Sequence, residues 1–384
     1  MIPYSKQYIS SLDLKNVEKV LKSNFLTQGP QVEKFEKKLC EYTGAKYSAA
    51  VNSATSALHL SCISLGIKKN DHVWTVSNTF VSSANCARLC GAIVSFLDIE
   101  LDFYLIDLVK LEKCLKNAKK NKKLPKLLIT VHLGGQPTYQ EKLKSLSNKY
   151  NFKIIEDASH SLGAIRNKNY VGNCKYSDIT VFSFHPVKSI TTGEGGAVMT
   201  NKKDIINKVK LLRTHGITKN QKEFKSKSVT PWHYEQHDLG LNYRMNSITA
   251  AVGLGQFERI ELLVKRRQAV GEFFLEAVLD CDWIETQEIP SYSEHGYFTF
   301  GLLYNGEAAK GVSWREFYNR YTKMGGDGFY ACWKNPYLEP SLKGKEYGTQ
   351  IWEEGLCPKA EKIQKKIMAF KTNYRDYEIA EYKI

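Results

Sequence analysis

A lysine and an aspartate, 31 positions apart, have the surroundings best suited to chemistry in this sequence. Lys188 follows the apolar run 178–184 (DITVFSF) and precedes the turn 191–196 (TTGEGG), whose glycines let the backbone approach a ligand closely. A lysine must be unprotonated to attack an aldehyde, and partial desolvation favours that neutral form. Most single lysines lie on the surface, so Lys188 is a candidate catalytic residue only when its sequence neighbours are considered with it.

The acidic partner, Asp157, ends the apolar run 153–157 (KIIED). At the carboxyl end of a buried strand in an open α/β sheet, such a residue points into the ligand crevice. A carboxylate there keeps a pyridine nitrogen protonated, and the protonated ring then acts as an electron sink. Taken alone, Asp157 could equally cap a helix that begins near Ala158. Together with Lys188, it predicts a pyridine cofactor whose aldehyde the lysine binds as a Schiff base.

A third segment suits a phosphate group. In residues 52–60 (NSATSALHL), small side chains lead from an expected strand into an expected helix, whose free N–H groups and positive dipole end attract anions. Ser183, five residues before Lys188, offers a hydroxyl for the same phosphate. Each signal is weak alone, since small-residue turns are common and strand serines often bond to the backbone.

The elements that must position these residues follow from short apolar runs that alternate with amphipathic stretches. The runs are 49–51, 72–76, 93–99, 126–133, 153–157 and 178–184. This alternation predicts parallel strands linked by helices, an α/β domain. From about Asn246, apolar residues keep helical spacing for some thirty positions and predict one long helix that leaves this domain. The segments 297–304 and 361–370 then fit a smaller α+β domain.

Composition limits the other possibilities. The chain has 384 residues, 42% of them hydrophobic and 25% charged, as expected of a folded protein with two domains. Without a run of about 20 apolar residues or a signal peptide, we expect a cytoplasmic protein and no membrane partner. The nine cysteines lack metal-ligand spacing and predict free thiols and no metal. The net charge of +15 favours an anionic substrate or a lysine-rich proteome over nucleic acid, because the basic run 113–126 lacks interleaved aromatics.

Eight segments, in order, resemble the DegT/DnrJ/EryC1/StrS aminotransferases, a sugar-aminotransferase branch of the aspartate aminotransferase fold (type I). They are FLTQGPQVEKFE (25–36), NSATSAL (52–58), NTFVSSAN (78–85), VHLGGQP (131–137), IIEDASHSLGA (154–164), FSFHPVKSITTGEGGAVMT (182–200), LLRTHGI (211–217) and YEQHDLGLNYRMNSITAAVGLGQ (234–256). The resemblance implies a three-layer α/β/α domain, residues 1–250, whose N-terminal segment packs on a small C-terminal α+β domain, residues 251–384.

The resemblance also implies a cofactor, pyridoxal 5'-phosphate (PLP), and a role for each matching residue. Lys188 carries the Schiff base and shuttles a proton, and Asp157 pairs with the pyridine nitrogen. His160 is expected to contact the phenolic oxygen, and Phe80 to stack on the ring. Ala54, Thr55 and Ser183 are expected to bind the phosphate. Asn242 is expected to reach the phosphate from a neighbouring subunit. A homodimer with shared active sites follows from the last contact. Without the family, Phe80 and His160 could be core residues.

The resemblance gives the amino donor as L-glutamate and the acceptor as a nucleotide-linked ketosugar for surface polysaccharide, capsule or glycan precursors. A histidine-tyrosine segment common in the family is missing here, and residues 324–340 and 355–378 stand in its place. A small phosphorylated ketone such as dihydroxyacetone phosphate therefore stays open as acceptor. Substrate contacts are expected at Thr27, Glu194, Tyr330 and Trp333, with Asn335 and Tyr337 as further candidates; an aromatic loop packed under the small domain is the plainer alternative.

Two other functions are open on this fold. A sugar dehydratase of the same fold has a histidine where the lysine belongs, so Lys188 argues against it. A basic nucleic-acid-binding protein could use the fold only as a scaffold, because fold alone does not fix function. The sequence shows no helix-turn-helix extension for that purpose.

Overall fold

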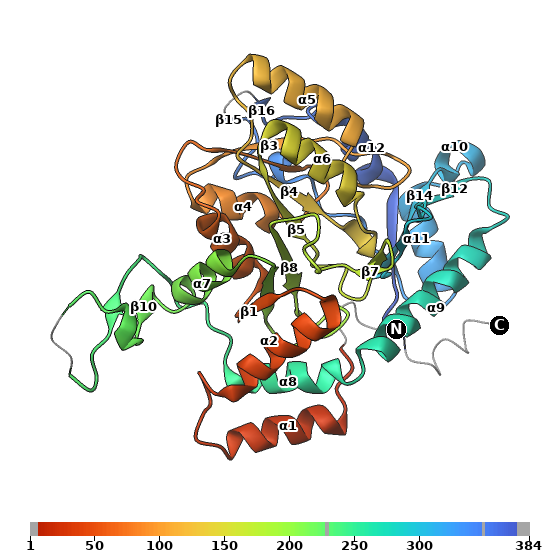
Figure 1. Ribbon diagram of the computed structural model, residues 1–384. Coiled ribbons are helices and arrows are strands. Elements are labelled where there is room, and N and C mark those ends of the chain that lie inside the picture. The colour runs from red at the N-terminus through yellow and green to blue at the C-terminus, as the bar shows by residue number, and fades with distance from the viewer. Residues whose placement is uncertain (1–6, 227–229, 348–349, 375–384) are drawn as a thin grey trace.

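A seven-stranded sheet forms the centre of the computed structural model, which describes residues 7–226, 230–347 and 350–374 (Figure 1). Its strands are β1 (Tyr47–Val51), β2 (His72–Val76), β3 (Ile93–Leu97), β4 (Leu127–Val131), β5 (Lys153–Asp157), β8 (Ile179–Ser183) and β9 (Gly196–Thr200). They lie in the order β1-β9-β8-β5-β4-β2-β3. All of them run parallel except β9, so their carboxyl ends share one edge.

The six strands expected from the sequence do run parallel, but strand β9 was not among them. It pairs antiparallel with both β8 and β1, with Ser183 opposite Gly196 and Val51 also opposite Gly196. The connection 184–195 contains no helix, and without a crossover helix the chain returns beside β8 in the opposite direction. This return places the Lys188 loop directly at the carboxyl edge of the sheet.

Helices cover both faces of the sheet and give the predicted three layers (Figure 1). One face carries α3 (Ala54–Ser64), α4 (Ser82–Leu89) and α7 (Lys203–Leu212), and the other carries α2 (Pro30–Thr43), α5 (Leu108–Lys120) and α6 (Gln140–Tyr150). The basic run falls mostly on α5, where Leu111, Leu115 and Ala118 are buried while Lys116 pairs with Glu112. Its lysines thus form the solvated face of an amphipathic helix.

The expected long helix is two helices, α8 (Ser247–Phe257) and α9 (Ile260–Val278). The break falls at Arg259, whose φ of −124° and ψ of 10° are not helical. Its guanidinium Nη2 lies 2.5 Å from Asp13 Oδ2 on α1 (Ser11–Leu21) and its centre lies 4.8 Å from the Tyr8 ring centroid. The apolar spacing continues through the break, so the sequence pattern alone predicted one helix wrongly.

The smaller region has its own sheet, β12 (Ile284–Thr286), β14 (Thr299–Tyr304) and β17 (Ile367–Lys371), with β14 central. Helices α9, α10 (Gly306–Lys310) and α11 (Trp314–Lys323) accompany it, and aromatic rings around Phe300 and Phe329 fill the space between. Residues 297–304 and 361–370 were expected here, and they contain β14 and most of α12 (Pro358–Lys366) and β17. Among the described residues, no helix is long and apolar enough to cross a bilayer.

Part of the C-terminal third packs back on the large sheet. The rings of Tyr337 and Trp352 lie 5.4 and 5.2 Å from that of Phe96 on β3, and Gln350 bonds to both backbone groups of Phe96. This segment therefore covers the β3 edge, although it follows the small sheet's β14 in sequence. The domain boundary at residue 250 stays a prediction, and residues 375–384 of the second domain lie outside the described residues.

Short elements complete the chain. They are β6 (Ile165–Arg166), β7 (Asn169–Tyr170), β10 (Ile217–Thr218), β11 (Glu235–Gln236), β13 (Ser293–Glu294), β15 (Glu346–Tyr347), β16 (Gln350–Ile351) and the 3-10 turns Leu133–Gly135, Gln221–Glu223 and Pro336–Leu338.

Candidate active site

A cavity of about 360 Å³ lies at the carboxyl edge of the large sheet. Nine of the predicted site residues line it: Ala54, Thr55, Phe80, Asp157, His160, Ser183, Lys188, Glu194 and Trp333. They come from the ends of β5 and β8, the start of α3, three loops and, through Trp333, the C-terminal third of the chain. The parallel strands bring them together, because their carboxyl ends open on one crevice.

Asp157 is buried and held by two serines. Its Oδ2 accepts a hydrogen bond of 2.7 Å from Ser83 Oγ, and its Oδ1 accepts bonds from the N–H and hydroxyl of Ser159. No helix begins at Ala158, since residues 158–164 form turns, so the helix-cap reading of Asp157 is wrong. Strand alternation turns the neighbouring Glu156 to the opposite face, where Arg166 Nη1 lies 3.1 Å from it. Asp157 therefore faces the cavity.

Lys188 reaches the same cavity from the β8–β9 loop. Its Nζ lies 4.4 Å from the centroid of the Phe298 ring. Burial lowers the pKa of its ammonium group from 10.5 to about 7; the negative charge of Asp157 opposes this shift and the guanidinium of Arg267 adds to it. A large share of the lysine is therefore unprotonated near neutral pH, which is the form that attacks an aldehyde.

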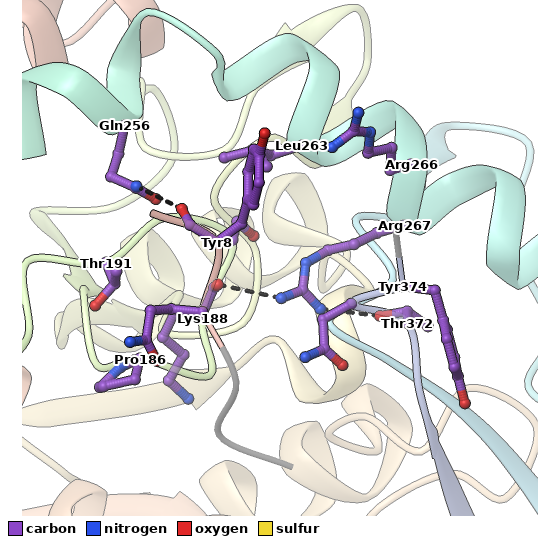
Figure 2. A pocket seen from close by; sticks show the side chains of 13 residues that line it. Tyr8, Pro186, Lys188, Thr191, Gln256, Leu263, Arg266, Arg267, Thr372 and Tyr374 are labelled. Carbon is purple, nitrogen blue, oxygen red and sulfur yellow. Dashed lines mark hydrogen bonds between the residues drawn. The ribbon is translucent and has the colours of Figure 1, made fainter. Parts of the chain in front are cut away.

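Arg267 on α9 holds the backbone of the loop that carries Lys188 (Figure 2). Its Nη2 donates to the carbonyls of Val187 and Lys188 at 3.1 Å each, and its Nη1 donates to Phe298 O at 3.1 Å and to Thr372 Oγ1 at 3.0 Å. One buried guanidinium thus ties the lysine loop to the residue before β14 and the residue after β17 in the small sheet. Its planar, rigid fork of donors suits such multiple contacts.

The first turn of α3 forms another wall. Ser53 caps this helix by accepting a bond of 3.1 Å from Ser56 N, while Thr55 Oγ1 lies 2.9 Å from Ser82 Oγ. The first N–H groups of a helix have no partner within it and point outward. On the other side, a Cβ added at Gly196 would meet Ala54 N at 2.6 Å, so only glycine lets β9 lie this close to the helix start.

Aromatic rings close the cavity on the side of the small sheet. His160 stacks on Phe298 at 3.9 Å between ring centroids, and Trp333 lies 5.3 Å from His160 and 5.7 Å from Phe80. Phe80 is 48% exposed, which excludes a role in core packing. Burial and the nearby cations Lys188 and Arg267 hold the pKa of His160 well below its usual value. Since its Nδ1 accepts from Gly134 N, the neutral ring carries its proton on Nε2.

Five predicted residues do not line this cavity. Asn335 and Tyr337 are buried beneath the surface, where the Asn335 amide donates to the Tyr337 hydroxyl. Thr27 and Asn242 are exposed elsewhere on the same chain, in isolated bridges with Asn246 and Thr214, and Tyr330 lines a neighbouring cavity. The sequence did not single out Ser82, Ser83 or Ser159, although the first two stand in the segment NTFVSSAN and the third follows Asp157 by two positions. Arg267 and Phe298 gave no local signal, because their contacts come from distant parts of the chain.

Comparisons with known proteins identify the family. A model of the DegT/DnrJ/EryC1/StrS aminotransferase family matches residues 7–371. The chain belongs to this family. It is 38% identical over 303 residues to a UDP-4-amino-4,6-dideoxy-N-acetyl-beta-L-altrosamine transaminase of Campylobacter jejuni, covering 79% of this chain and 76% of that protein. It is 31% identical over 301 residues to the spore coat polysaccharide biosynthesis protein SpsC of Bacillus subtilis, covering 78% and 75%.

Solved structures share the fold over nearly the whole chain. PseC of Helicobacter pylori, an aminotransferase in pseudoaminic acid biosynthesis, superposes with a TM-score of 0.84 at 25% identity, covering 99% of this chain and 96% of that one. A putative sugar aminotransferase of Streptococcus pneumoniae, in its PMP form, superposes with a TM-score of 0.85 at 23% identity, covering 99% and 97%. Because the chain belongs to this family and its relatives at 37–38% identity are transaminases, it is an aminotransferase, and the dehydratase and scaffold alternatives are not supported.

Pyridoxal phosphate is the cofactor of this family, and the cavity fits it. The space of about 360 Å³ lies within the usual range for cofactor sites. A buried carboxylate, a lysine with a lowered pKa and a helix N-terminus all face it. These three groups match the pyridine nitrogen, the aldehyde and the phosphate of the cofactor.

Proposed function

We propose that this enzyme transfers an amino group from L-glutamate to the ketone of a nucleotide-linked ketosugar, in the cytoplasm, for surface polysaccharide or glycan precursors. The observation that carries the proposal is the meeting of Lys188, Asp157 and the start of α3 around one cavity. Both substrates enter by the same route in turn, because one lysine must serve both halves of the reaction. The enzyme works as a homodimer with shared active sites.

Each polar side chain has a distinct part in this proposal. When bound, pyridoxal phosphate supplies an electron sink for the bond broken at the substrate carbon. Lys188 Nζ would hold the aldehyde and, as the base in the site, would move a proton at the substrate carbon. The Asp157 carboxylate, fixed by Ser83 and Ser159, keeps the pyridine nitrogen protonated. His160 donates its Nε2 proton to the phenolic oxygen.

The phosphate and the ring need their own contacts. The N–H groups of Ala54 and Thr55 and the hydroxyls of Thr55 and Ser183 hold the phosphate, and Asn242 of the neighbouring subunit adds an amide. Phe80 would stack on the pyridine ring, and Trp333, whose ring lies 5.7 Å from that of Phe80, would exclude water from the reacting carbon. Glu194, exposed at the cavity, and Thr27 of the partner contact the substrate.

The names of the relatives support a nucleotide sugar as acceptor. The Campylobacter jejuni relative is a transaminase of a UDP-linked 4-amino-4,6-dideoxy sugar, and SpsC belongs to polysaccharide biosynthesis. No observation favours a small ketone such as dihydroxyacetone phosphate.

The two half-reactions test the proposal separately. Purified enzyme should be yellow, L-glutamate should bleach it, and a UDP-linked 4-ketosugar should restore the colour. The variant Lys188→Ala should lose the absorption of the covalently held cofactor, whereas Lys203→Ala on the exposed start of α7 should keep it. Unchanged absorption in Lys188→Ala would falsify the assignment of the lysine. Restoration of colour by dihydroxyacetone phosphate alone would refute the nucleotide-sugar acceptor.

A further inference from the structure

Three of the nine cysteines meet near the carboxyl ends of helices α3 and α4. All nine are free thiols, which confirms the prediction from the sequence. Cys62 lies in the last turn of α3, with its Sγ 3.8 Å from Cys86 Sγ on α4, and Cys90 is the residue that ends α4. The first turns of the same two helices line the cofactor cavity through Thr55 and Ser82. The three thiols are thus separate from the residues that line that cavity.

The three thiols differ in their access to solvent. Cys62 and Cys86 are fully buried in the core of the large domain, whereas Cys90 is half-buried and packs against that core from outside. His59, one turn before Cys62 on α3, is also half-buried, and its Nδ1 lies 3.2 Å from the Tyr243 hydroxyl. A small reagent in solution can therefore reach Cys90 before it reaches the other two cysteines.

Hydrogen bonding makes Cys90 the reactive member of the cluster. The Cys62 thiol lowers the pKa of the Cys90 thiol to about 5, burial opposes this shift, and the His59 ring adds to it. Contacts with Cys86 and Cys90, together with burial, raise the pKa of Cys62 well above its usual value. Cys90 is therefore a thiolate at neutral pH beside a protonated thiol. The thiolate is the form that reacts with peroxides and with alkylating agents.

The cluster does not fit a metal ion. Among the residues that the structure describes, no group of three or more His, Cys, Asp or Glu side chains is arranged to hold one. An accessible thiolate with a second thiol beside it is instead the arrangement in which a sulfenic acid condenses to a disulfide. We propose that Cys90 is a modification site that reacts with a hydroperoxide, and that Cys62 then forms a reversible disulfide with it.

The chemistry has two steps. The Cys90 thiolate attacks one oxygen of the hydroperoxide, so that an S–O bond forms, the O–O bond breaks, and the other oxygen takes up a proton and leaves as water or an alcohol. Cys62 then gives up its proton and attacks the Cys90 sulfur. The S–S bond forms, the S–O bond breaks, and the hydroxide leaves with that proton as water. Two thiols lose two electrons and one peroxide gains them. A thiol reductant reverses the bond, as a reducing cytoplasm would.

Alkylation of the wild-type holoenzyme tests the reactivity of Cys90 without any substitution. Cys114 on α5 is the internal control, because it is also half-buried and packs against the same core, while burial raises the pKa of its thiol. At pH 6, iodoacetamide should modify Cys90 roughly 10-fold faster than Cys114. The larger share of thiolate outweighs the weaker nucleophilicity of a thiolate of low pKa. Equal rates would overturn the proposal and leave the three cysteines as small apolar residues of the core.

Peptide mapping identifies the disulfide. Trypsin cuts after Arg88, so Cys86 and Cys90 fall on different peptides. One equivalent of hydrogen peroxide should link the Cys62 peptide to the Cys90 peptide within one chain, and dithiothreitol should release both. Cys62→Ser should instead leave a sulfenic acid on Cys90 that dimedone traps, and Cys90→Ser should keep Cys62 and Cys86 reduced. Cofactor absorption and bleaching by glutamate show that each variant is folded.

Two results of the mapping would overturn the assignment. A bond between Cys62 and Cys86 that forms equally well in Cys90→Ser would show that Cys90 is not the point of attack. A bond from Cys90 to a second chain, seen as a dimer on a non-reducing gel, would show that Cys62 is not its partner. Neither result bears on the amino acceptor, so the proposed function is tested separately.

Discussion

The reactivity of Lys188 depends on its position more than on its type. A solvated lysine is almost fully charged at neutral pH, but burial lowers the pKa of this one to about 7. Only the unprotonated amine captures an aldehyde, so the rate of pyridoxal phosphate capture by cofactor-free enzyme should rise with pH around a midpoint near 7 and level off above it. Stopped-flow absorbance between pH 5.5 and 9.5 measures this rate. A rate that still rises steeply at pH 9.5 would show that the lysine is solvated.

Arg267 should act on the same lysine in two separable ways. Its positive charge lowers the pKa of Lys188, and its hydrogen bonds fix the carbonyls of Val187 and Lys188. Arg267→Met removes both effects, so the midpoint of cofactor capture should move to higher pH and the capture rate at high pH should fall. Arg267→Lys keeps the positive charge but loses the planar pair of guanidinium donors. It should therefore keep the pH midpoint of cofactor capture and lower only the capture rate at high pH. Equal midpoints in all three proteins would rule out the electrostatic effect.

Asp157 supplies a charge that an amide cannot replace. In Asp157→Asn the side chain keeps its shape, but the pyridine nitrogen loses the carboxylate that holds its proton. We expect kcat to fall by a factor on the order of 100, as when one preorganised electrostatic group is removed from an active site. Ser159→Ala removes one of the bonds to the carboxylate and keeps the charge, so its kcat should change far less. Similar losses in both variants would mean that orientation, not charge, is what Asp157 contributes.

At the scale of the element, the start of α3 should matter for the cofactor beyond its part in stability. Ser53 caps α3 and Ser313 caps α11 through equivalent bonds, at 3.1 Å to Ser56 N and 3.2 Å to Glu316 N. Replacing either cap with alanine should destabilise its helix by about 1 kcal/mol. Only Ser53 fronts the cofactor cavity, so Ser53→Ala should also weaken pyridoxal phosphate binding, by roughly 5-fold for the same free energy. Titration of the two cofactor-free variants, with thermal melts alongside, tests the difference.

Strands and helices that follow from the local spacing of apolar residues were predicted correctly from the sequence. The buried strands around Val73 and Ile155 read as apolar runs, and their parallel order brought Asp157 and Lys188 to one edge. The break at Arg259 was missed because Asp13 and Tyr8, far away in the sequence, hold it. Antiparallel β9 was missed because a glycine-rich turn hides its start. Local periodicity carries no information on such distant contacts.

The same limit applies to the site. Side chains in the motif segments, such as Ser183 and His160, could be placed at the cavity from the chain alone, whereas Phe298 and Arg267 could not. Both come from the region after α8, where the chain returns to the lysine loop only through the arrangement of the small sheet. The contacts between the small sheet and the lysine loop thus arise from the tertiary structure, which explains why the sequence predicted the residues of the cofactor cavity better than those behind it.

At the scale of the whole molecule, the residues that flank the small sheet's strands meet the loop that carries Lys188. Arg267 spans this junction, bonding to the lysine loop on one side and to Phe298 and Thr372 on the other. A shift of the small sheet would therefore move the lysine backbone together with the Phe298 and Trp333 walls. The small sheet and the loop that carries Lys188 are therefore mechanically connected through one side chain.

Asn242 tests whether two chains share each active site. It is exposed, its carbonyl accepts a long bond from Asn52, and it does not line the cavity of its own chain. In a two-fold dimer each chain can offer such a residue to the other. Asn242→Asp places a negative charge against the phosphate of whichever site it serves, so this variant should be impaired, and Lys188→Ala should be inactive. A mixed dimer of the two variants then has one site with an intact lysine.

The origin of the asparagine in that site decides the result. If Asn242 acts across the interface, the intact lysine meets the intact asparagine of the Lys188→Ala chain, and random mixing should restore about a quarter of wild-type activity, since half the dimers are mixed and each has one of two sites intact. If Asn242 acts within its own chain, the intact lysine always faces the aspartate, and mixing restores nothing. Unfolding and refolding the two variants together, with each refolded alone as control, distinguishes these cases by activity per protomer.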